Sequence, residues 1–225
     1  MASDVDICNL ALAHLGDSAT VATIDPPEGS AQAEHCSRFY PIARDALLEM
    51  HQWGFATRRA ALAQLDNTSA SWAYCYAVPN NVLNVIAVLA PDAGDDYSNA
   101  PTNSWVNAYP AYPLSAFGAY TPQPFVLESR EDDGAEVIYT NQPDAVLRYT
   151  VRITDTSKFS PLFVECLSWL LASHLAGPVL KGDTGTSAAT KTYQVFKSRL
   201  SDAVESDANQ RSVKPAHNVS WLNGR

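Results

Sequence analysis

The side chains able to bind a metal ion or act as catalysts are spread along this chain without local grouping. Among five histidines and four cysteines, no two have the C-x-x-C, H-E-x-x-H or H-x-x-x-H spacing of a zinc site. A metal site would need residues that meet only in the folded chain, for which His14, Cys36, Cys166 and His174 are the candidates. In a helical core such side chains are more often packed or hydrogen-bonded than metal-bound, so no metal site is predicted.

Nucleotide, hydrolase and calcium motifs are incomplete or missing from the sequence. Residues 177–184 have the outline of a phosphate-binding loop, but Asp183 stands where a lysine must meet the phosphate charge. Neither G-x-S-x-G nor G-x-G-x-x-G occurs. The acidic runs at 95–96 and 131–133 are typical of solvated turns, and no twelve-residue calcium loop follows them. These incomplete motifs therefore predict no nucleotide, hydrolase or calcium site and no cofactor.

Aromatic residues beside basic ones offer another chemistry, the stacking of nucleic-acid bases. Trp53 and Phe55 precede Arg58 and Arg59, a pattern found in proteins that bind single strands. The formal net charge of −9 argues against a general DNA-binding surface. We therefore expect these aromatic residues to close one end of a helical bundle or to lie in an interface.

Two segments are rich in residues that form protein contacts. Residues 90–124 hold six of the fourteen prolines and six aromatic residues without helical or strand periodicity, and such long loops are usually functional or mobile. Residues 209–225 hold three basic residues, a tryptophan and no acid, and form either a frayed terminus or an arm that orders on binding. The predicted contact residues are Trp105, Tyr109, Tyr112, Phe117 and Tyr120 in the long segment and Arg211, Lys214, Trp221, Leu222 and Arg225 in the C-terminal segment.

Helical periodicity occurs toward both ends of the chain. A helix is predicted over about residues 4–15, with Ser3 and Asp6 as a capping box, and a second over 33–50, which Pro41 should kink.

A third helix begins at Ser160, and Gly177 and Pro178 are expected to stop it. After a turn rich in glycine and threonine, a fourth helix is expected from near Ser187. Its predicted buried face consists of Tyr193, Phe196, Leu200 and Val204.

Strand patterns fill the middle of the chain, where period-two alternation and β-branched residues predict a β-meander or a small sandwich. The predicted strands lie within residues 72–78, 82–89, 125–129, 135–140 and 145–153. The structure of residues 53–65 stays open at this stage.

The predicted fold class is α+β, a four-helix bundle with an inserted antiparallel β-rich domain and an extended C-terminal arm; two layers closing on a sheet are the alternative. The expected domain limits are 1–66 and 156–208 for the two parts of the bundle, 67–155 for the insertion and 209–225 for the arm. Residues 1–154 carry seven basic and eighteen acidic residues, net −11, and the remainder eight and six, net +2. Opposite charges on one subunit suit head-to-tail association in a ring.

Targeting signals are not evident in the sequence. No run of eighteen apolar residues occurs and the first six residues contain no lysine or arginine, so neither a membrane span nor a secretory signal is predicted. The four separated cysteines are expected to be free thiols in a protein made in the cytoplasm.

Several motifs, in their order along the chain, resemble the head-to-tail adaptor (connector) family of tailed bacteriophages, which includes tail tubular protein A of short-tailed phages. The resemblance spans most of the chain. The matching stretches are Ile7–Gly16, Tyr40–Leu48, His51–Ala56 with Arg59 and Leu62, Tyr74–Pro79, Leu147–Tyr149, Ile153–Asp155, Phe159–Glu165 and Leu175–Pro178.

The resemblance implies a non-enzymatic virion protein with a helical bundle interrupted by a β-domain. It also implies a homo-oligomeric ring, commonly a dodecamer, at the head-tail junction between the portal protein and the tail, through which viral DNA passes without specific binding. The C-terminal segment would reach the portal, and residues 90–124, longer than the family's usual connection, would face a tail nozzle or other tail protein. A soluble phage-encoded binding module and a hydrolase with a non-local site are the alternatives.

Overall fold

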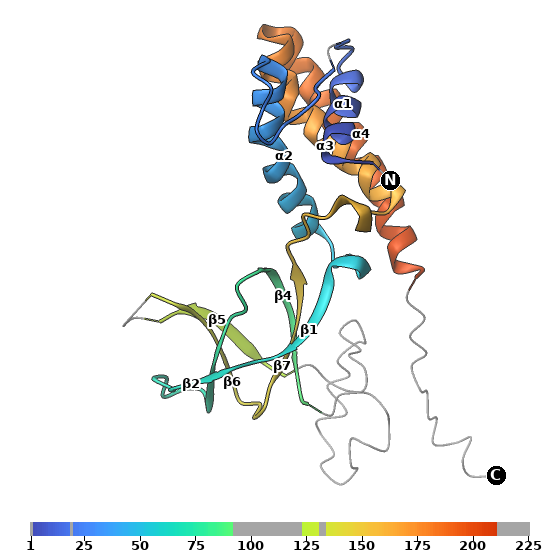
Figure 1. Cartoon of the computed structure of the whole chain (residues 1–225). Coiled ribbons are helices and arrows are strands. Elements are labelled where there is room, and N and C mark those ends of the chain that lie inside the picture. Colours follow the sequence, from blue (N-terminus) through green and yellow to red (C-terminus); the bar gives the residue numbers. More distant parts are fainter. Residues whose placement is uncertain (1, 19, 92–122, 131–133, 211–225) are drawn as a thin grey trace, which may run out of the picture. The chain divides into compact units, whose positions relative to one another are not determined.

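The structure, a computed structural model, describes residues 2–18, 20–91, 123–130 and 134–210 (Figure 1). In this part the chain is mixed α+β, with four α-helices and two antiparallel sheets. It divides into a helical unit, Met1–Ala56 with Arg152–Arg211, and a β unit that contains Thr57–Val151. The two units divide after Ala56 and after Val151, before the expected limits at 66 and 155. The first strand begins directly after Ala56, and the last strand ends at Val151.

Helix α1 spans Asp4–His14 and begins at the predicted capping box. The Asp6 amide donates to Ser3 Oγ at 3.1 Å and the Ser3 amide donates to the Asp6 carboxylate at 2.8 Å. Hydrogen bonding of the carboxylate by the Ser3 amide, and then by the Ser3 side chain, lowers the pKa of Asp6 below its ordinary value. Both hydrogen bonds satisfy amides that the start of a helix leaves without partners.

Helix α2 spans Ala31–Met50 and begins where Ser30 Oγ accepts a hydrogen bond from the Ala33 amide. It runs through Pro41, which is exposed. Its buried stripe repeats at helical spacing, as predicted, and consists of Ala33, Cys36, Tyr40, Ala43, Arg44, Leu47 and Leu48.

Helix α3 spans Pro161–Leu180, so the predicted stop at Gly177 and Pro178 is wrong. Proline removes only one helical hydrogen bond there, and the amide of Lys181 donates to the Gly177 carbonyl at 3.0 Å to complete the final turn. The other three helices pack against α3. Among the described helices only α3 is long and apolar enough to cross a membrane by length and composition, and half of that stretch is buried inside the helical unit.

Helix α4 spans Gly182–Ala208 and begins earlier than the predicted Ser187. Gly185 explains the difference, since a Cβ there would lie 2.9 Å from the Ala176 carbonyl oxygen. The small residues that suggested a turn instead allow α4 to lie directly against α3. The predicted buried face is also wrong in part, because Tyr193 is 39% exposed. The buried residues are Gly185, Thr192, Phe196, Ala203 and Asp207.

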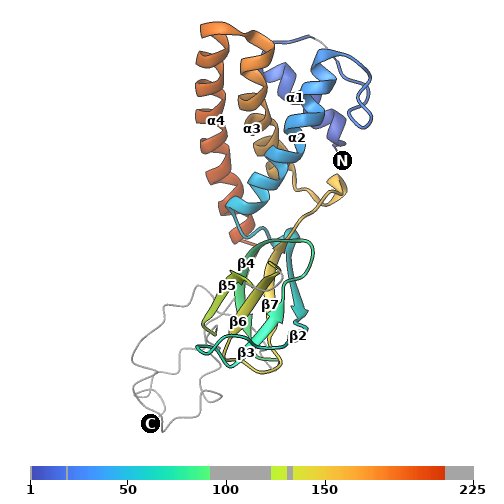
Figure 2. The same cartoon turned by 90° about the vertical axis from the view of Figure 1, so that its left-hand side faces the viewer.

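The β unit holds two sheets, and all pairs within them are antiparallel (Figure 2). One has the order β1-β7-β4 and the other β2-β3-β6-β5. The strands are β1 (Thr57–Ala61), β2 (Gln64–Leu65), β3 (Tyr74–Ala77), β4 (Val82–Leu89), β5 (Phe125–Ser129), β6 (Glu136–Thr140) and β7 (Val146–Val151).

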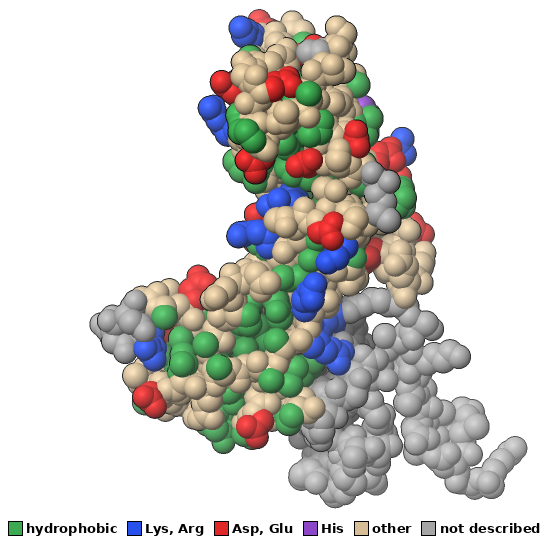
Figure 3. All heavy atoms as spheres, viewed as in Figure 1, with side chains coloured by type: hydrophobic (Ala, Val, Ile, Leu, Met, Phe, Trp, Pro, Cys, Tyr) green, Lys and Arg blue, Asp and Glu red, His purple; other side chains and the backbone are tan. Residues whose placement is uncertain are grey.

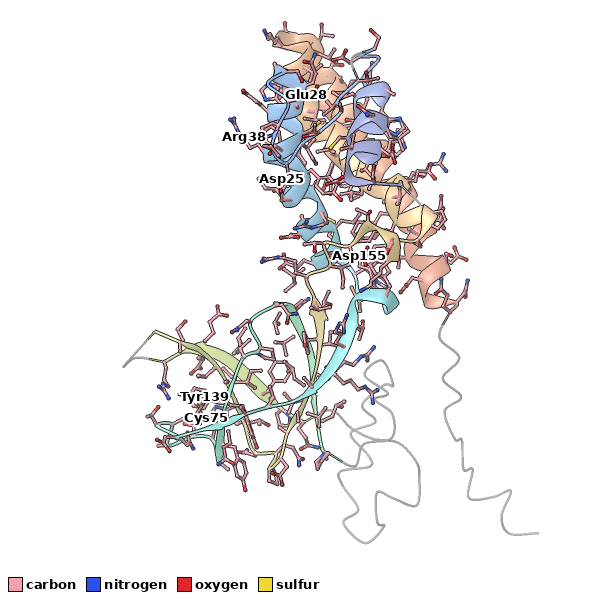
Figure 4. The ribbon with its side chains drawn as sticks, viewed as in Figure 1. Asp25, Glu28, Arg38, Cys75, Tyr139 and Asp155 are labelled. Atoms are coloured by element: carbon pink, nitrogen blue, oxygen red, sulfur yellow. The ribbon has the colours of Figure 1, made fainter. Side chains whose placement is uncertain are left out.

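The five predicted strands are confirmed, whereas β1 and β2 lie where the sequence pattern was left open. A meander is wrong, because a meander pairs consecutive strands and β7 here pairs with β1 and β4. Cys75 and Tyr139 are cross-strand partners on β3 and β6 and form a buried cluster with Val137 (Figure 4).

Candidate functional site

Both predicted contact segments lie largely outside the described residues. Trp105, Tyr109, Tyr112, Phe117 and Tyr120 fall within 92–122, and Arg211, Lys214, Trp221, Leu222 and Arg225 fall within 211–225. The acidic runs at 95–96 and 131–133 also lie outside the described residues. The described residues show instead how the chain is held where it enters and leaves these segments.

The long segment has both of its described ends fixed in the β unit. The Gln123 amide donates to the Val88 carbonyl at 2.8 Å, which places the residues after the segment beside β4. Thr140 Oγ1 donates to the Pro124 carbonyl at 2.9 Å. The chain that leaves at the end of β4 therefore returns to the same strand before β5 begins.

The C-terminal segment follows a turn of α4 that one buried carboxylate holds in place. Both carboxylate oxygens of Asp207, a residue 8% exposed, lie 3.1 Å from the Gly54 amide, which donates to them. His51 Nε2 lies 3.2 Å from Oδ2. We call this arrangement the Asp207 contact.

A carboxylate in this position needs such partners. The C-terminal end of a helix carries partial negative charge, so an aspartate in the last turn of α4 is unfavourable unless donors surround it. Burial adds a further cost that hydrogen bonds must offset. The Asp207 contact thus joins the base of the C-terminal segment to the residues between α2 and β1, and nothing local in the sequence distinguishes Asp207 from a solvated acid.

An aromatic cluster fills the helical unit next to the Asp207 contact. Trp53 is 1% exposed, donates from Nε1 to the Leu47 carbonyl at 2.8 Å and meets Phe163 with ring centroids 5.0 Å apart. Phe55 and Phe159 also contact Phe163. Trp53 is therefore a core residue rather than a base-stacking one, whereas Arg58 and Arg59 on β1 are exposed.

Asp45 on α2 joins two arginines of the helical unit. The Arg44 guanidinium and Arg152 Nε lie 2.8 and 2.9 Å from its two carboxylate oxygens. Arg152 is the first residue after β7, so this pair fixes the chain where it re-enters the helical unit. The spacing of these three residues in the sequence does not predict their contact.

The candidate metal ligands are packed separately. His14 Nε2 lies 3.1 Å from Ser168 Oγ and its ring stacks on Trp169 at 3.7 Å, while His174 lies parallel to Phe39. Burial lowers the pKa of both histidines.

The cysteines of this set are buried thiols. Burial raises the pKa of Cys166 to about 12. Cys36 forms a hydrogen bond with Cys8, and this hydrogen bond together with burial raises the pKa of Cys8. No group of three metal-ligating side chains occurs among the residues that the structure describes.

The described geometry therefore has the character of an anchoring framework. The carboxylates of Asp207 and Asp45 hold the chain in the helical unit, and backbone and hydroxyl hydrogen bonds hold the return of the long segment in the β unit. No known protein-family model matches this chain, and no curated protein matches it.

Proposed function

We propose that this protein is a structural head-to-tail adaptor of a tailed bacteriophage. In this proposal a twelvefold ring of copies lies in the virion neck between the portal protein and the tail nozzle or another tail protein. The ring leaves a lumen through which viral DNA passes without specific binding. The protein is not an enzyme in this role.

The observation that carries the proposal is the way the chain is shared between its two units. Helices α1 and α2 precede every strand, α3 and α4 follow every strand, and all four belong to the same unit. Figure 1 shows the blue helices of the chain's start beside the orange helices near its end. An interrupted helical unit of this kind supports the resemblance to the adaptor family.

The motifs that carry the resemblance also meet in space. Trp53 and Phe55 come from the His51–Ala56 motif, and both contact Phe163 of the Phe159–Glu165 motif. These residues build packing and not a reactive site, which supports a shared fold with a structural role.

The finer architecture is part of the proposal: the four helices form a bundle, the strands form an inserted domain, and the C-terminal segment is an extended arm. The arm contacts the portal or a neighbouring subunit through the basic and aromatic residues predicted above. The aromatic residues of the long segment contact the tail side. Both segments begin from points that hydrogen bonds hold in place.

The acidic balance suits a channel for DNA. The chain has 24 acidic against 15 basic residues, and carboxylates that face a lumen repel phosphates, so that DNA slides without adhering. A DNA-binding protein would need the opposite balance, because neutralised phosphates supply most of the affinity.

The proposal is tested by co-expressing the tagged chain with the portal protein of the same phage and imaging the purified particles by electron microscopy. We expect the chain to co-purify with the portal and to appear as a ring on its tail-facing side. In whole virions the same ring should occupy the neck. A chain that stays free of portals and virions would remove the proposal.

A further inference from the structure

The helical unit carries opposite charges on different helices. Residues 1–37 contain six acidic residues and no lysine or arginine, whereas residues 184–201 of α4 contain three basic residues and no acid. The acidic residues are Asp4, Asp6, Asp17, Asp25, Glu28 and Glu34, and the basic ones are Lys191, Lys197 and Arg199.

The acidic side has an exposed row on α1. Asp6, Leu10 and Ala13 follow one another at four- and three-residue steps and are all exposed, with Leu10 at 40%. Asp25 and Glu28 add exposed carboxylates on the loop between α1 and α2 (Figure 4). In the view of Figure 3, acidic, basic and apolar side chains are interspersed over the helical unit. In the view of Figure 4 the two loop residues lie near Arg38 of α2, so acidic side chains are not alone there. We call the α1 residues Asp6, Leu10 and Ala13, together with the loop residues Asp25 and Glu28, the acidic face.

The basic side lies along the solvent-facing surface of α4. Lys191, Gln194 and Lys197 follow one another at three-residue steps and are exposed. Lys197 Nζ lies 5.1 Å from the centre of the Tyr193 ring, and Tyr193 is itself 39% exposed. We call Lys191, Tyr193, Gln194 and Lys197 the basic face.

The charges on both faces are available to a partner. Arg199 pairs with Glu165 and Asp202, but neither Lys191 nor Lys197 forms an ion pair with any described residue. On the acidic face, Asp6 accepts a hydrogen bond from the Ser3 amide, and Glu28 accepts hydrogen bonds from the Ala22 amide and the Ser30 hydroxyl. Neither carboxylate forms an ion pair within the part of the chain that the structure describes. Each face also has one exposed large apolar side chain with a charged residue one helical turn away, Leu10 with Asp6 and Tyr193 with Lys197. An apolar centre beside charged groups is typical of a protein contact.

The two faces belong to helices on different sides of α3. His14 of α1 contacts Ser168 and Trp169, whereas Gly185 of α4 lies against Ala176. Figure 2 shows α3 between α4 and α1. One copy can therefore use both faces at the same time, which makes the contact heterologous and allows successive copies to close into a ring.

We propose that the acidic face of one copy docks on the basic face of the next copy, with Leu10 and Tyr193 at the centre of the contact. The proposal rests on the proposed ring and names the surfaces that build it. The opposite charges determine which two faces meet and how the neighbouring copies are oriented. The apolar side chains at the centre supply the apolar area that the contact buries.

The test uses engineered cysteines in phage particles. Virions are prepared with the full chain carrying Leu10→Cys and Tyr193→Cys together, oxidised mildly, and analysed by non-reducing electrophoresis. The four natural cysteines are buried, so they add no background crosslinks. We expect a ladder of multimers that rises one subunit at a time, and no ladder from either single variant.

A matched control pairs Leu10→Cys with Met50→Cys. Met50 is at least as exposed as Tyr193, at 49% against 39%, but lies at the end of α2 outside both faces. That pair should give no ladder. A missing Leu10–Tyr193 ladder in particles whose neck ring is visible by electron microscopy overturns the assigned faces and leaves the proposed function standing. A crosslink from Tyr193→Cys to a different virion protein overturns them too. Absence of the ring from wild-type particles defeats the proposed function itself.

A second variant separates charge from geometry. Lys191→Glu with Lys197→Glu places like charges in the contact, so ring-bearing particles should fall at least about tenfold. The isolated chain should unfold at the wild-type midpoint, because both lysines are exposed. An unchanged particle yield would contradict the proposal.

Discussion

At the scale of single residues, buried polar side chains that hydrogen-bond to a distant segment hold parts of the chain together. Asp207 is the clearest case, because its carboxylate accepts a hydrogen bond from the Gly54 amide and lies beside His51. It stands at the C-terminal end of a helix, where a negative charge is unfavourable. A carboxylate that must be held by donors from another segment joins that segment to its own. Here the joined segments are the end of α4 and the turn before β1.

Replacing Asp207 with alanine removes that link. The Gly54 amide then loses its hydrogen bond to a charged acceptor, so the free energy of unfolding should fall by about 1 to 3 kcal/mol. Glu205→Ala, an exposed change on the same helix, should cost less than about 0.5 kcal/mol. Urea titration of the two variants measures both values, and equal stabilities would show that the Asp207 contact contributes nothing.

The two half-buried histidines of the helical unit, His14 and His174, predict how stability depends on pH. Burial lowers the pKa of His14 and His174 in the folded chain below the ordinary 6.5, so the unfolded chain binds protons more readily. The free energy of unfolding should therefore be fully present above pH 6.5 and should decrease as the pH falls through and below that value. His14→Gln should flatten part of the decrease, and a dependence of the opposite sign would contradict the assigned cause.

At the scale of elements, the sequence predicts helices and strands better than it predicts where they end. Hydrophobic periodicity and helix caps depend on residues close together in the sequence. The capping box at Ser3 and the strands from Tyr74 onward could therefore be predicted. Glycine has two uses that the sequence alone does not separate, since it permits turns and also permits close helix contact. At Gly185 the second use applies, which is why α4 begins before the predicted residue.

The same distinction predicts opposite effects for two glycines in packed helices. Gly185→Ala introduces a Cβ 2.9 Å from the Ala176 carbonyl oxygen, and should destabilise the chain by about 1 to 3 kcal/mol despite alanine's better helix propensity. Gly177→Ala meets no atom within 4 Å and should stabilise α3 by up to about 1 kcal/mol. Thermal unfolding of both variants tests the pair. Stabilisation by both would show that α3 and α4 separate easily.

The candidate site follows from the sequence only in its outline. Composition alone marks the long segment and the C-terminal segment as unusual, because proline, aromatic residues and charge bias are visible without a fold. The anchors of these segments are not visible, since Asp207 and Gly54 or Asp45 and Arg152 are far apart along the chain and have no spacing rule. Side chains that meet through tertiary packing leave little local signal.

At the scale of the whole molecule, the proposed function assigns folding and attachment to different parts of the chain. The last buried residue of α4 is Asp207 and the helix ends at Ala208, so its packed stripe lies before residue 209. Deleting 209–225 should leave the thermal midpoint of the helical unit unchanged and abolish binding to the portal. Pull-down with the portal measures the second effect, with the full chain as reference. Undiminished binding by the shortened chain would assign portal contact elsewhere.

The interruption of the helical unit also governs the order in which the protein can be built on the ribosome. Residues 57–151 are continuous and emerge together, whereas α1 and α2 must wait for α3, the helix on which they pack, to be translated. During that interval their apolar stripes remain without a partner. The β unit can fold meanwhile, and its pairing of β1 with β7 brings its first and last residues close together. This closeness reduces the entropy cost of bringing α1 and α2 into contact with α3.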